Sequence, residues 1–200
     1  MNNTNAATVE IQSFQGIQEV RLETHLLATR KMFLLSEINA ETANNFMMQF
    51  MHLEKQSHDP IYIFINSPGG EITSGLLIYD LIQAAKSPVY MYCTGMAASM
   101  AAIILAGGQK GRRFILPHSK TMIHEPLLSG GVGGSATSIS NISNSILETK
   151  KLVNTILSKH TGKSIKEINK ATSFDNYMNA EESVAFGICD EIKEVSFDGE

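Results

Sequence analysis

Short continuous apolar runs alternate along the chain with stretches in which apolar residues recur every three or four positions. Ile61–Ile65 and Val89–Cys93 are apolar runs rich in β-branched and aromatic residues, as in buried strands of a parallel sheet. The stretch 71–86 has helical spacing and ends at Ser87–Pro88. The pattern predicts strands at 32–35, 61–65, 89–93, 114–116, 121–123 and 188–192, helices at about 40–56, 71–86, 97–106 and 135–160, and short helices after Ser164 and Asn179.

A glycine-containing turn and a helix follow each of the two central strands. Asn66–Gly70 follows the first strand, and Gly95 is expected to break the second. Repeated strand–turn–helix units predict an α/β fold. We expect residues 1–25 to be an N-terminal segment, partly disordered because Met1–Ala7 has nothing to bury, and residues 26–200 to form one domain.

The predicted helix at 135–160 has a narrow apolar stripe. Its apolar residues follow three- and four-residue steps, and the remaining positions are mostly Ser, Asn, Thr and Lys. A stripe this narrow on a helix this long indicates that the helix projects from the body and packs against another chain. The residues of the stripe are Ile139, Ile142, Ile146, Val153 and Ile156.

Ser99 is the one polar side chain in the first turn of the apolar helix expected at 97–106. A hydroxyl at this place lies among unpaired backbone N–H groups and at the positive end of the helix dipole, where an oxyanion can be stabilised. Two interpretations follow: Ser99 is a nucleophile, or it is an ordinary N-cap serine.

A nucleophilic serine requires a base and a group that orients the base. His124 stands at the end of an apolar strand, where a rigid element can position it, although a hydrogen-bonded structural histidine fits the pattern equally well. Asp175 lies between Phe174 and Tyr177 in a segment with few charges. The competing aspartates are Asp59, Asp80, Asp190 and Asp198, and spacing alone does not choose among them.

Composition narrows the possible functions. The net charge of −4 and the lack of a basic run argue against a nucleic-acid partner. Cys93 and Cys189 lie in separate apolar segments and are expected to be buried free thiols of a reducing compartment. No secretory leader, spanning segment, metal-ligand spacing or phosphate loop is evident, so we expect a cytoplasmic protein without membrane contact, metal or cofactor.

Five motifs in register resemble the Clp protease family, that is, the proteolytic subunit ClpP. The resemblance extends from about Leu26 to Ile192 and implies a ClpP/crotonase-type fold of repeated ββα units, with the helix at about 135–160 as a projecting handle. The motifs are Phe64–Gly70 (FINSPGG), Ile78–Asp80 (IYD), Gly95–Met100 (GMAASM), Met122–Pro126 (MIHEP) and His160–Gly162 (HTG).

The resemblance also implies roles for individual residues. Ser99 matches the nucleophile of the family, His124 its general base and Asp175 the third member of the triad. The backbone N–H groups of Gly70 and Met100 match its oxyanion hole. A surface pocket for the partner ATPase corresponds to Tyr62, Phe64 and Leu116.

The expected function is therefore a serine endopeptidase that hydrolyses unfolded polypeptides. Family members form heptameric rings, stacked in pairs, that a hexameric AAA+ unfoldase supplies with substrate, and ATP is used by that partner. One alternative is an auxiliary subunit that is active only in a mixed ring with a paralogue. The other is a crotonase-type acyl-CoA enzyme, which the presence of both Ser99 and His124 disfavours.

Overall fold

The computed structural model describes residues 7–13, 16–128, 131 and 133–194. Residues 1–6 lie outside this description, so the expected disorder at the N-terminus stays a prediction. The glycine-rich stretch 129–134 is expected from its composition to be flexible, and residues 129, 130 and 132 of it also lie outside the described residues.

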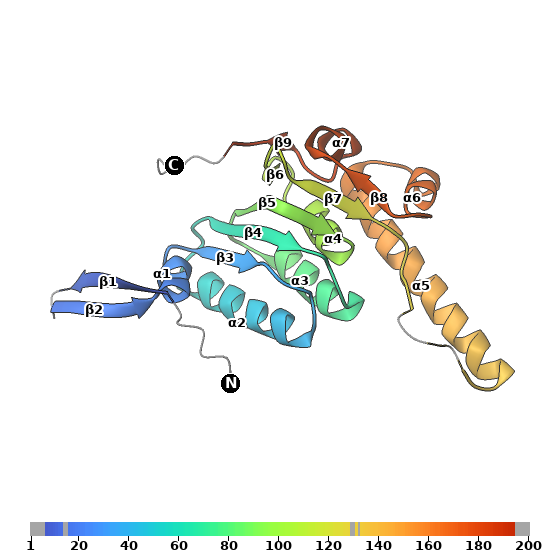
Figure 1. Ribbon diagram of the computed structural model, residues 1–200, viewed down its shortest axis with the longest axis horizontal. Coiled ribbons are helices and arrows are strands. Elements are labelled where there is room, and N and C mark those ends of the chain that lie inside the picture. The colour runs from blue at the N-terminus through green and yellow to red at the C-terminus, as the bar shows by residue number, and fades with distance from the viewer. Residues whose placement is uncertain (1–6, 14–15, 129–130, 132, 195–200) are drawn as a thin grey trace.

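A mainly parallel sheet of seven strands forms the centre of the described structure, and an antiparallel pair, β1–β2, extends from it (Figure 1). In the large sheet β3, β4, β5, β6 and β9 follow one another in parallel, β7 continues beside the end of β5, and β8 pairs antiparallel with β7. The strands are β1 (Thr8–Ser13), β2 (Gly16–Arg21), β3 (Lys31–Leu34), β4 (Ile61–Ser67), β5 (Val89–Ala98), β6 (Arg113–Ile115), β7 (Lys120–Ile123), β8 (Asn176–Met178) and β9 (Glu191–Ile192).

Helices cover one face of this sheet. Ile61, Ile63 and Ile65 of β4 are fully buried beneath them, and α2, α3 and α4 follow one another in contact along that face (Figure 1). The apolar sides of these three helices therefore face the core. The helices are α1 (Leu22–Ala28), α2 (Ala40–Gln56), α3 (Ile72–Ala84), α4 (Met100–Ala106), α5 (Ala136–Thr161), α6 (Ile165–Ala171) and α7 (Ala180–Phe186).

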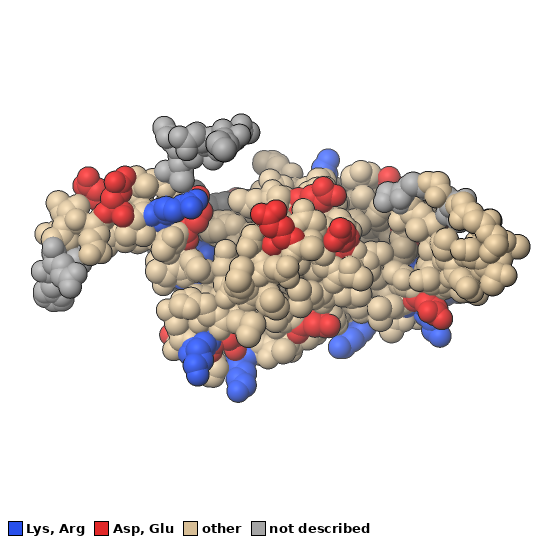
Figure 2. Space-filling model, turned by 90° about the horizontal axis from the view of Figure 1, so that it is seen from below, with Lys and Arg blue, Asp and Glu red and all other residues tan. Residues whose placement is uncertain are grey.

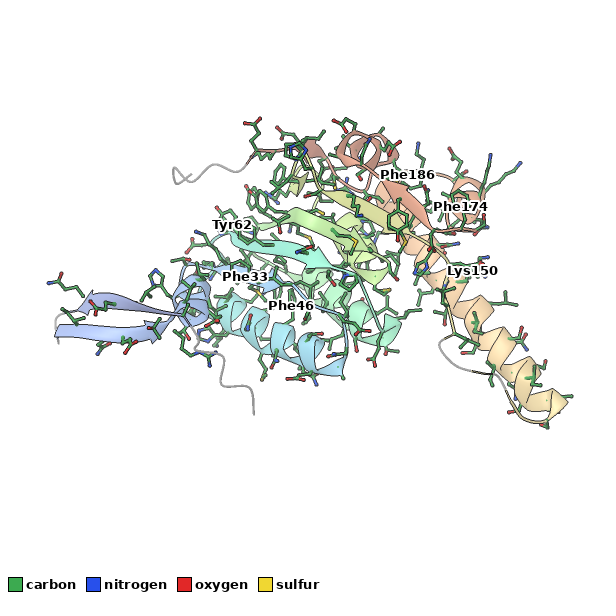
Figure 3. All side chains as sticks on the ribbon, viewed as in Figure 1. Phe33, Phe46, Tyr62, Lys150, Phe174 and Phe186 are labelled. Atoms are coloured by element: carbon green, nitrogen blue, oxygen red, sulfur yellow. The ribbon has the colours of Figure 1, made fainter. Side chains whose placement is uncertain are left out.

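The opposite face of the sheet carries stacked aromatic rings. Phe64 stacks on Tyr92 with ring centroids 5.3 Å apart, and Tyr62 stacks on Tyr90 at 5.4 Å. Strand alternation turns these rings away from the helices, and Tyr62 in Figure 3 lies on the other side of the sheet from Phe46 of α2. We call this surface the aromatic face; it comprises Phe33, Tyr62, Phe64, Tyr90, Tyr92 and Phe114.

The helix α5 extends well beyond the rest of the molecule (Figure 1). In its inner half Val153, Ile156 and Leu157 are buried, whereas Ile139 and Leu147 of the outer half are 44% and 59% exposed. Residues 136–147 contain no charged side chain, and the right-hand end of Figure 2 is accordingly without red or blue. The helix projects as the stripe predicts; its packing against another chain stays a prediction.

A buried ion pair ties the C-terminal strand to the helices. Arg113, 3% exposed, contacts Asp190 at 2.5 Å between Nη2 and Oδ1. Its guanidinium also donates to the backbone carbonyl groups of Ala106, His160 and Gly187. Arg113 therefore joins the ends of α4, α5 and α7 to one another.

Three sequence predictions are wrong in detail. The strand predicted to end at Cys93 continues to Ala98, and the next helix begins at Met100. Gly95 does not break the strand: a Cβ there would lie 2.6 Å from Asn66 Oδ1, so glycine is needed for a close approach. The strand predicted at 188–192 forms only over Glu191–Ile192.

In the described part of the chain, no helix has both the length and the apolarity to cross a bilayer.

Candidate active site

Ser99 occupies the sharp turn between β5 and α4. Its backbone has φ 53° and ψ −124°, a conformation that costs a non-glycine residue of order 1–3 kcal/mol. It stands at the N-cap position, yet within the described structure its side chain makes no capping hydrogen bond. The N-cap interpretation is therefore wrong, because the hydroxyl points elsewhere.

That hydroxyl contacts His124. The distance between Ser99 Oγ and His124 Nε2 is 2.9 Å, and the His124 side chain is 16% exposed. The pairing of β5 with β7 brings the two together, since Ala98 lies opposite Met122 and the Ser99 N–H donates to the Met122 carbonyl at 2.8 Å. A serine hydroxyl and an imidazole at this distance have the geometry that acyl transfer requires of a nucleophile and its base.

Asp175 lies beside the other nitrogen of the imidazole. Its Oδ1 is 3.4 Å from His124 Nδ1, and its side chain is 62% exposed. Nδ1 is buried and has no hydrogen-bond partner among the described residues. The carboxylate is thus within ion-pair distance but does not hold the ring by a hydrogen bond.

The strand β8, which the sequence pattern did not reveal, explains why Asp175 is there. β8 runs antiparallel to β7 with Asn176 opposite Ile123, so the residues just outside this pair, Asp175 and His124, lie side by side. The three competing aspartates that the structure describes have other surroundings: Asp59 binds Ser57, Asp80 is exposed on α3 and Asp190 binds Arg113.

The backbone at Gly69 packs against Ser99, and the backbone at Gly70 packs against Ile38. A Cβ added to Gly69 would lie 2.7 Å from Ser99 Cβ, and one added to Gly70 would lie 2.1 Å from the Ile38 carbonyl oxygen. Gly70 and Met100 line the same cavity as Ser99 and His124. The two residues for which the resemblance implies an oxyanion hole thus line the same cavity as Ser99.

The cavity at Ser99 measures about 210 Å³. Its walls are mostly apolar, with polar chemistry concentrated at Ser99, His124 and Glu125. An apolar cavity with a few convergent polar groups is the usual form of a ligand-binding or active site. The apolar lining comprises Pro68, Ile72, Met100, Ile103, Met122, Pro126, Leu127 and Val153.

Two thiols and one further histidine are buried or half-buried in structural surroundings. Burial raises the pKa of the Cys93 thiol to about 11 and also raises the pKa of Cys189, so neither thiol is reactive near neutral pH. His160, in the last turn of α5, is hydrogen-bonded to the Tyr79 hydroxyl at 2.8 Å. Within the ranges described, no group of three or more His, Cys, Asp or Glu side chains could hold a metal ion.

The residues expected to contact an ATPase lie away from this cavity. Tyr62 and Phe64 belong to the aromatic face, and Leu116, half-buried, follows two residues after Phe114. Tyr90 and Tyr92, whose alternation along β5 is visible in the sequence, stack on Tyr62 and Phe64.

A family model described as Clp protease matches residues 15–196. This range includes both central strands, the turn at Ser99 and the segments that carry His124 and Asp175. Because the match covers most of the chain, the protein belongs to the Clp protease family and is a Clp-type peptidase.

Proposed function

We propose that the protein is a serine endopeptidase that hydrolyses unfolded polypeptides through Ser99, His124 and Asp175. The observation that carries this proposal is the 2.9 Å contact between Ser99 Oγ and His124 Nε2, at a strained turn beside a largely apolar cavity. Peptide hydrolysis needs a nucleophile, a base and donors for the oxyanion, and this cavity brings candidates for all three together.

In the proposed mechanism, His124 takes the proton of Ser99 as the hydroxyl oxygen attacks the scissile carbonyl carbon. The imidazolium then gives this proton to the leaving amine, and the C–N bond breaks. Water then attacks the acyl carbon while His124 accepts its proton. The ester bond to Ser99 breaks, His124 returns the proton to Oγ, and the carboxylic acid product leaves. Asp175 stabilises the imidazolium once its carboxylate reaches Nδ1.

The tetrahedral intermediate carries a negative oxygen. We assign its stabilisation to the N–H groups of Gly70 and Met100, and loss of one such donor costs about 10²–10³ in rate. Met100 is the first residue of α4, so the positive end of the helix dipole also favours this charge.

Clp proteases form ring-shaped oligomers that work with Clp ATPases. For this chain we propose heptameric rings stacked in pairs through α5, whose outer half has exposed apolar side chains and no charges. A hexameric AAA+ unfoldase binds the aromatic face, including Tyr62 and Phe64, and delivers substrate. The peptidase needs no cofactor of its own, and ATP is used by the unfoldase.

A second candidate is an auxiliary subunit that acts in a mixed ring beside a paralogue. Asp175 leaves room for a contact from such a neighbour, because its carboxylate is 62% exposed and 3.4 Å from His124 within the protomer, although an identical subunit would meet it equally well. A neighbouring subunit that covered Asp175 could complete the triad. Measuring peptidase activity and native mass on the purified protein alone distinguishes the two candidates.

Covalent labelling tests the endopeptidase proposal. A fluorophosphonate should modify Ser99, and His124→Ala should abolish the modification. Ser99→Ala should retain the native mass of the assembly and lose peptide hydrolysis. Hydrolysis that survives Ser99→Ala would place the nucleophile elsewhere and overturn the proposal.

A further inference from the structure

An ion pair connects the loop after the proposed catalytic base to α5. The Glu125 carboxylate contacts the Lys150 ammonium group, and their side chains are 40% and 30% exposed. Glu125 directly follows His124, and Lys150 belongs to the inner half of α5 (Figure 3). The pair therefore joins the segment that carries the imidazole to the long helix.

The imidazole depends on this segment for its position. Its Nε2 contacts Ser99, but its Nδ1 has no hydrogen-bond partner in the part of the chain that the structure describes. The strand β7 ends at Ile123, one residue before His124. The ring is accordingly positioned by how the backbone beyond β7 is anchored.

Two contacts of Glu125 provide that anchoring. Its backbone N–H donates to the Thr172 carbonyl at 2.7 Å, and its carboxylate accepts from Lys150. The first contact holds the loop against the C-terminal end of α6, and the second contact holds it against α5.

One turn further along α5, Asn154 binds the segment that leads to Asp175. Its side chain is 1% exposed and donates to Thr172 Oγ1 at 3.3 Å and to Asn169 Oδ1 at 2.8 Å. Thr172 precedes Asp175 by three residues. Lys150 and Asn154 lie four positions apart on one helix. Lys150 therefore binds the segment that follows His124, and Asn154 binds the segment that leads to Asp175.

We propose that Lys150 is a positioning residue of the peptidase: through Glu125 it holds His124 in line with Ser99. The inference rests on the proposed function, since it assumes that His124 is the base. A small misplacement of a catalytic group can lower the rate severely. A partly exposed ion pair adds little to global stability, so its loss should affect turnover and not folding.

Lys150→Met removes the charge and keeps most of the aliphatic stem. In the assembled protein we expect kcat for a fluorogenic peptide to fall by about three- to tenfold with KM unchanged, because the Glu125 backbone contact to Thr172 remains. Lys151→Met is the matched control, since it removes the same charge from the exposed next position of α5. The exchanged pair, Glu125→Lys with Lys150→Glu, should recover most of the lost kcat.

The rate of Ser99 labelling by a fluorophosphonate should fall with kcat in Lys150→Met, at unchanged native mass and melting temperature. Equal kcat in Lys150→Met and Lys151→Met would overturn the inference. It would also be overturned if the exchanged pair had a lower kcat than Glu125→Lys alone or Lys150→Glu alone. Failure of the proposed function is read separately: activity that survives Ser99→Ala contradicts the mechanism whatever Lys150 does.

Discussion

Gly69 lies directly against Ser99, so close that a Cβ on Gly69 would be 2.7 Å from the Cβ of the serine and 2.5 Å from the Ala98 carbonyl oxygen. Gly69 also has φ +88°, a backbone conformation that side chains disfavour. The strained turn at Ser99 and the turn at Gly69 therefore pack against each other backbone to backbone.

Gly69→Ala should disable the peptidase. The added methyl group meets backbone that cannot move aside, so Ser99 and the N–H of Met100 must shift; we expect kcat to fall by about 10²-fold or more. Gly111→Ala is a suitable control because Gly111 has φ +82° and an added Cβ there meets nothing within 4 Å. Stopped or continuous peptide assays give kcat; similar values for the two variants would contradict this view of the site.

Asp175→Asn tests whether the exposed carboxylate takes part in catalysis. Asparagine keeps the shape and removes the charge that we propose stabilises the imidazolium, so we expect kcat to fall by about 10²–10⁴-fold in the assembled protein. Asp80→Asn, at an exposed position of α3, is the charge-matched control. A kcat for Asp175→Asn within twofold of the wild type would exclude Asp175 from the mechanism.

The sequence predicts the central strands, most helices and the long α5 well because their apolar patterns are local. It could not reveal β8, since Asn176–Met178 has no strand pattern and forms by pairing with β7. The sequence pattern also predicts Ser99 inside a helix. Glycine usually ends a strand, and the contact of Gly95 with Asn66, which explains why β5 continues, is not visible in the sequence. Ser99, His124 and Asp175 could be named through the family resemblance, whereas the Glu125–Lys150 contact depends on tertiary structure and has no local signal.

Phe64→Ala should separate ATPase-driven proteolysis from peptide hydrolysis. Phe64 stacks with Phe33 and Tyr92 on the aromatic face, and loss of a central aromatic side chain typically weakens an interface by about tenfold or more. Degradation of a folded, tagged substrate by the peptidase with a Clp ATPase should fall accordingly, while cleavage of a short peptide is retained.

The control for this experiment is Met48→Ala. Met48 is 59% exposed on α2, which covers the opposite face of the sheet. If Phe64→Ala degrades the folded substrate as fast as Met48→Ala does, the ATPase does not bind the aromatic face.

Asp190→Asn should destabilise the fold. Burial alone raises the pKa of Asp190, but the hydrogen bonds and positive charge of Arg113 outweigh it and leave the pKa below its usual value. Removing one charge of a buried pair leaves the guanidinium uncompensated, and we expect a loss of about 3 kcal/mol in the free energy of unfolding at pH 7.

The pH dependence of this effect has a definite sign. A carboxyl group whose pKa is lowered by folding stabilises the protein above its unfolded pKa, near 3.9, and this contribution is lost as pH falls through the folded value. The stability difference between wild type and Asp190→Asn, measured by urea unfolding, should therefore shrink below about pH 4. Glu23→Gln, which breaks the exposed pair with Arg21, should change stability by less than about 0.5 kcal/mol.

His160 should make the protein less stable in mild acid. Burial, followed by the nearby charges of Lys159 and Arg113, lowers the pKa of this histidine, and the neutral ring is hydrogen-bonded to the Tyr79 hydroxyl. Because the unfolded chain binds the proton more readily, the stabilisation is complete above about pH 6.5 and is lost as pH falls toward the folded pKa of His160.

His160→Gln can still accept a hydrogen bond from Tyr79 but does not titrate. Its melting temperature should therefore vary less between pH 7.5 and 5.5 than that of the wild type, whereas His118→Gln, at an exposed position, should follow the wild type. Parallel curves for His160→Gln and wild type would show that His160 does not cause the acid sensitivity.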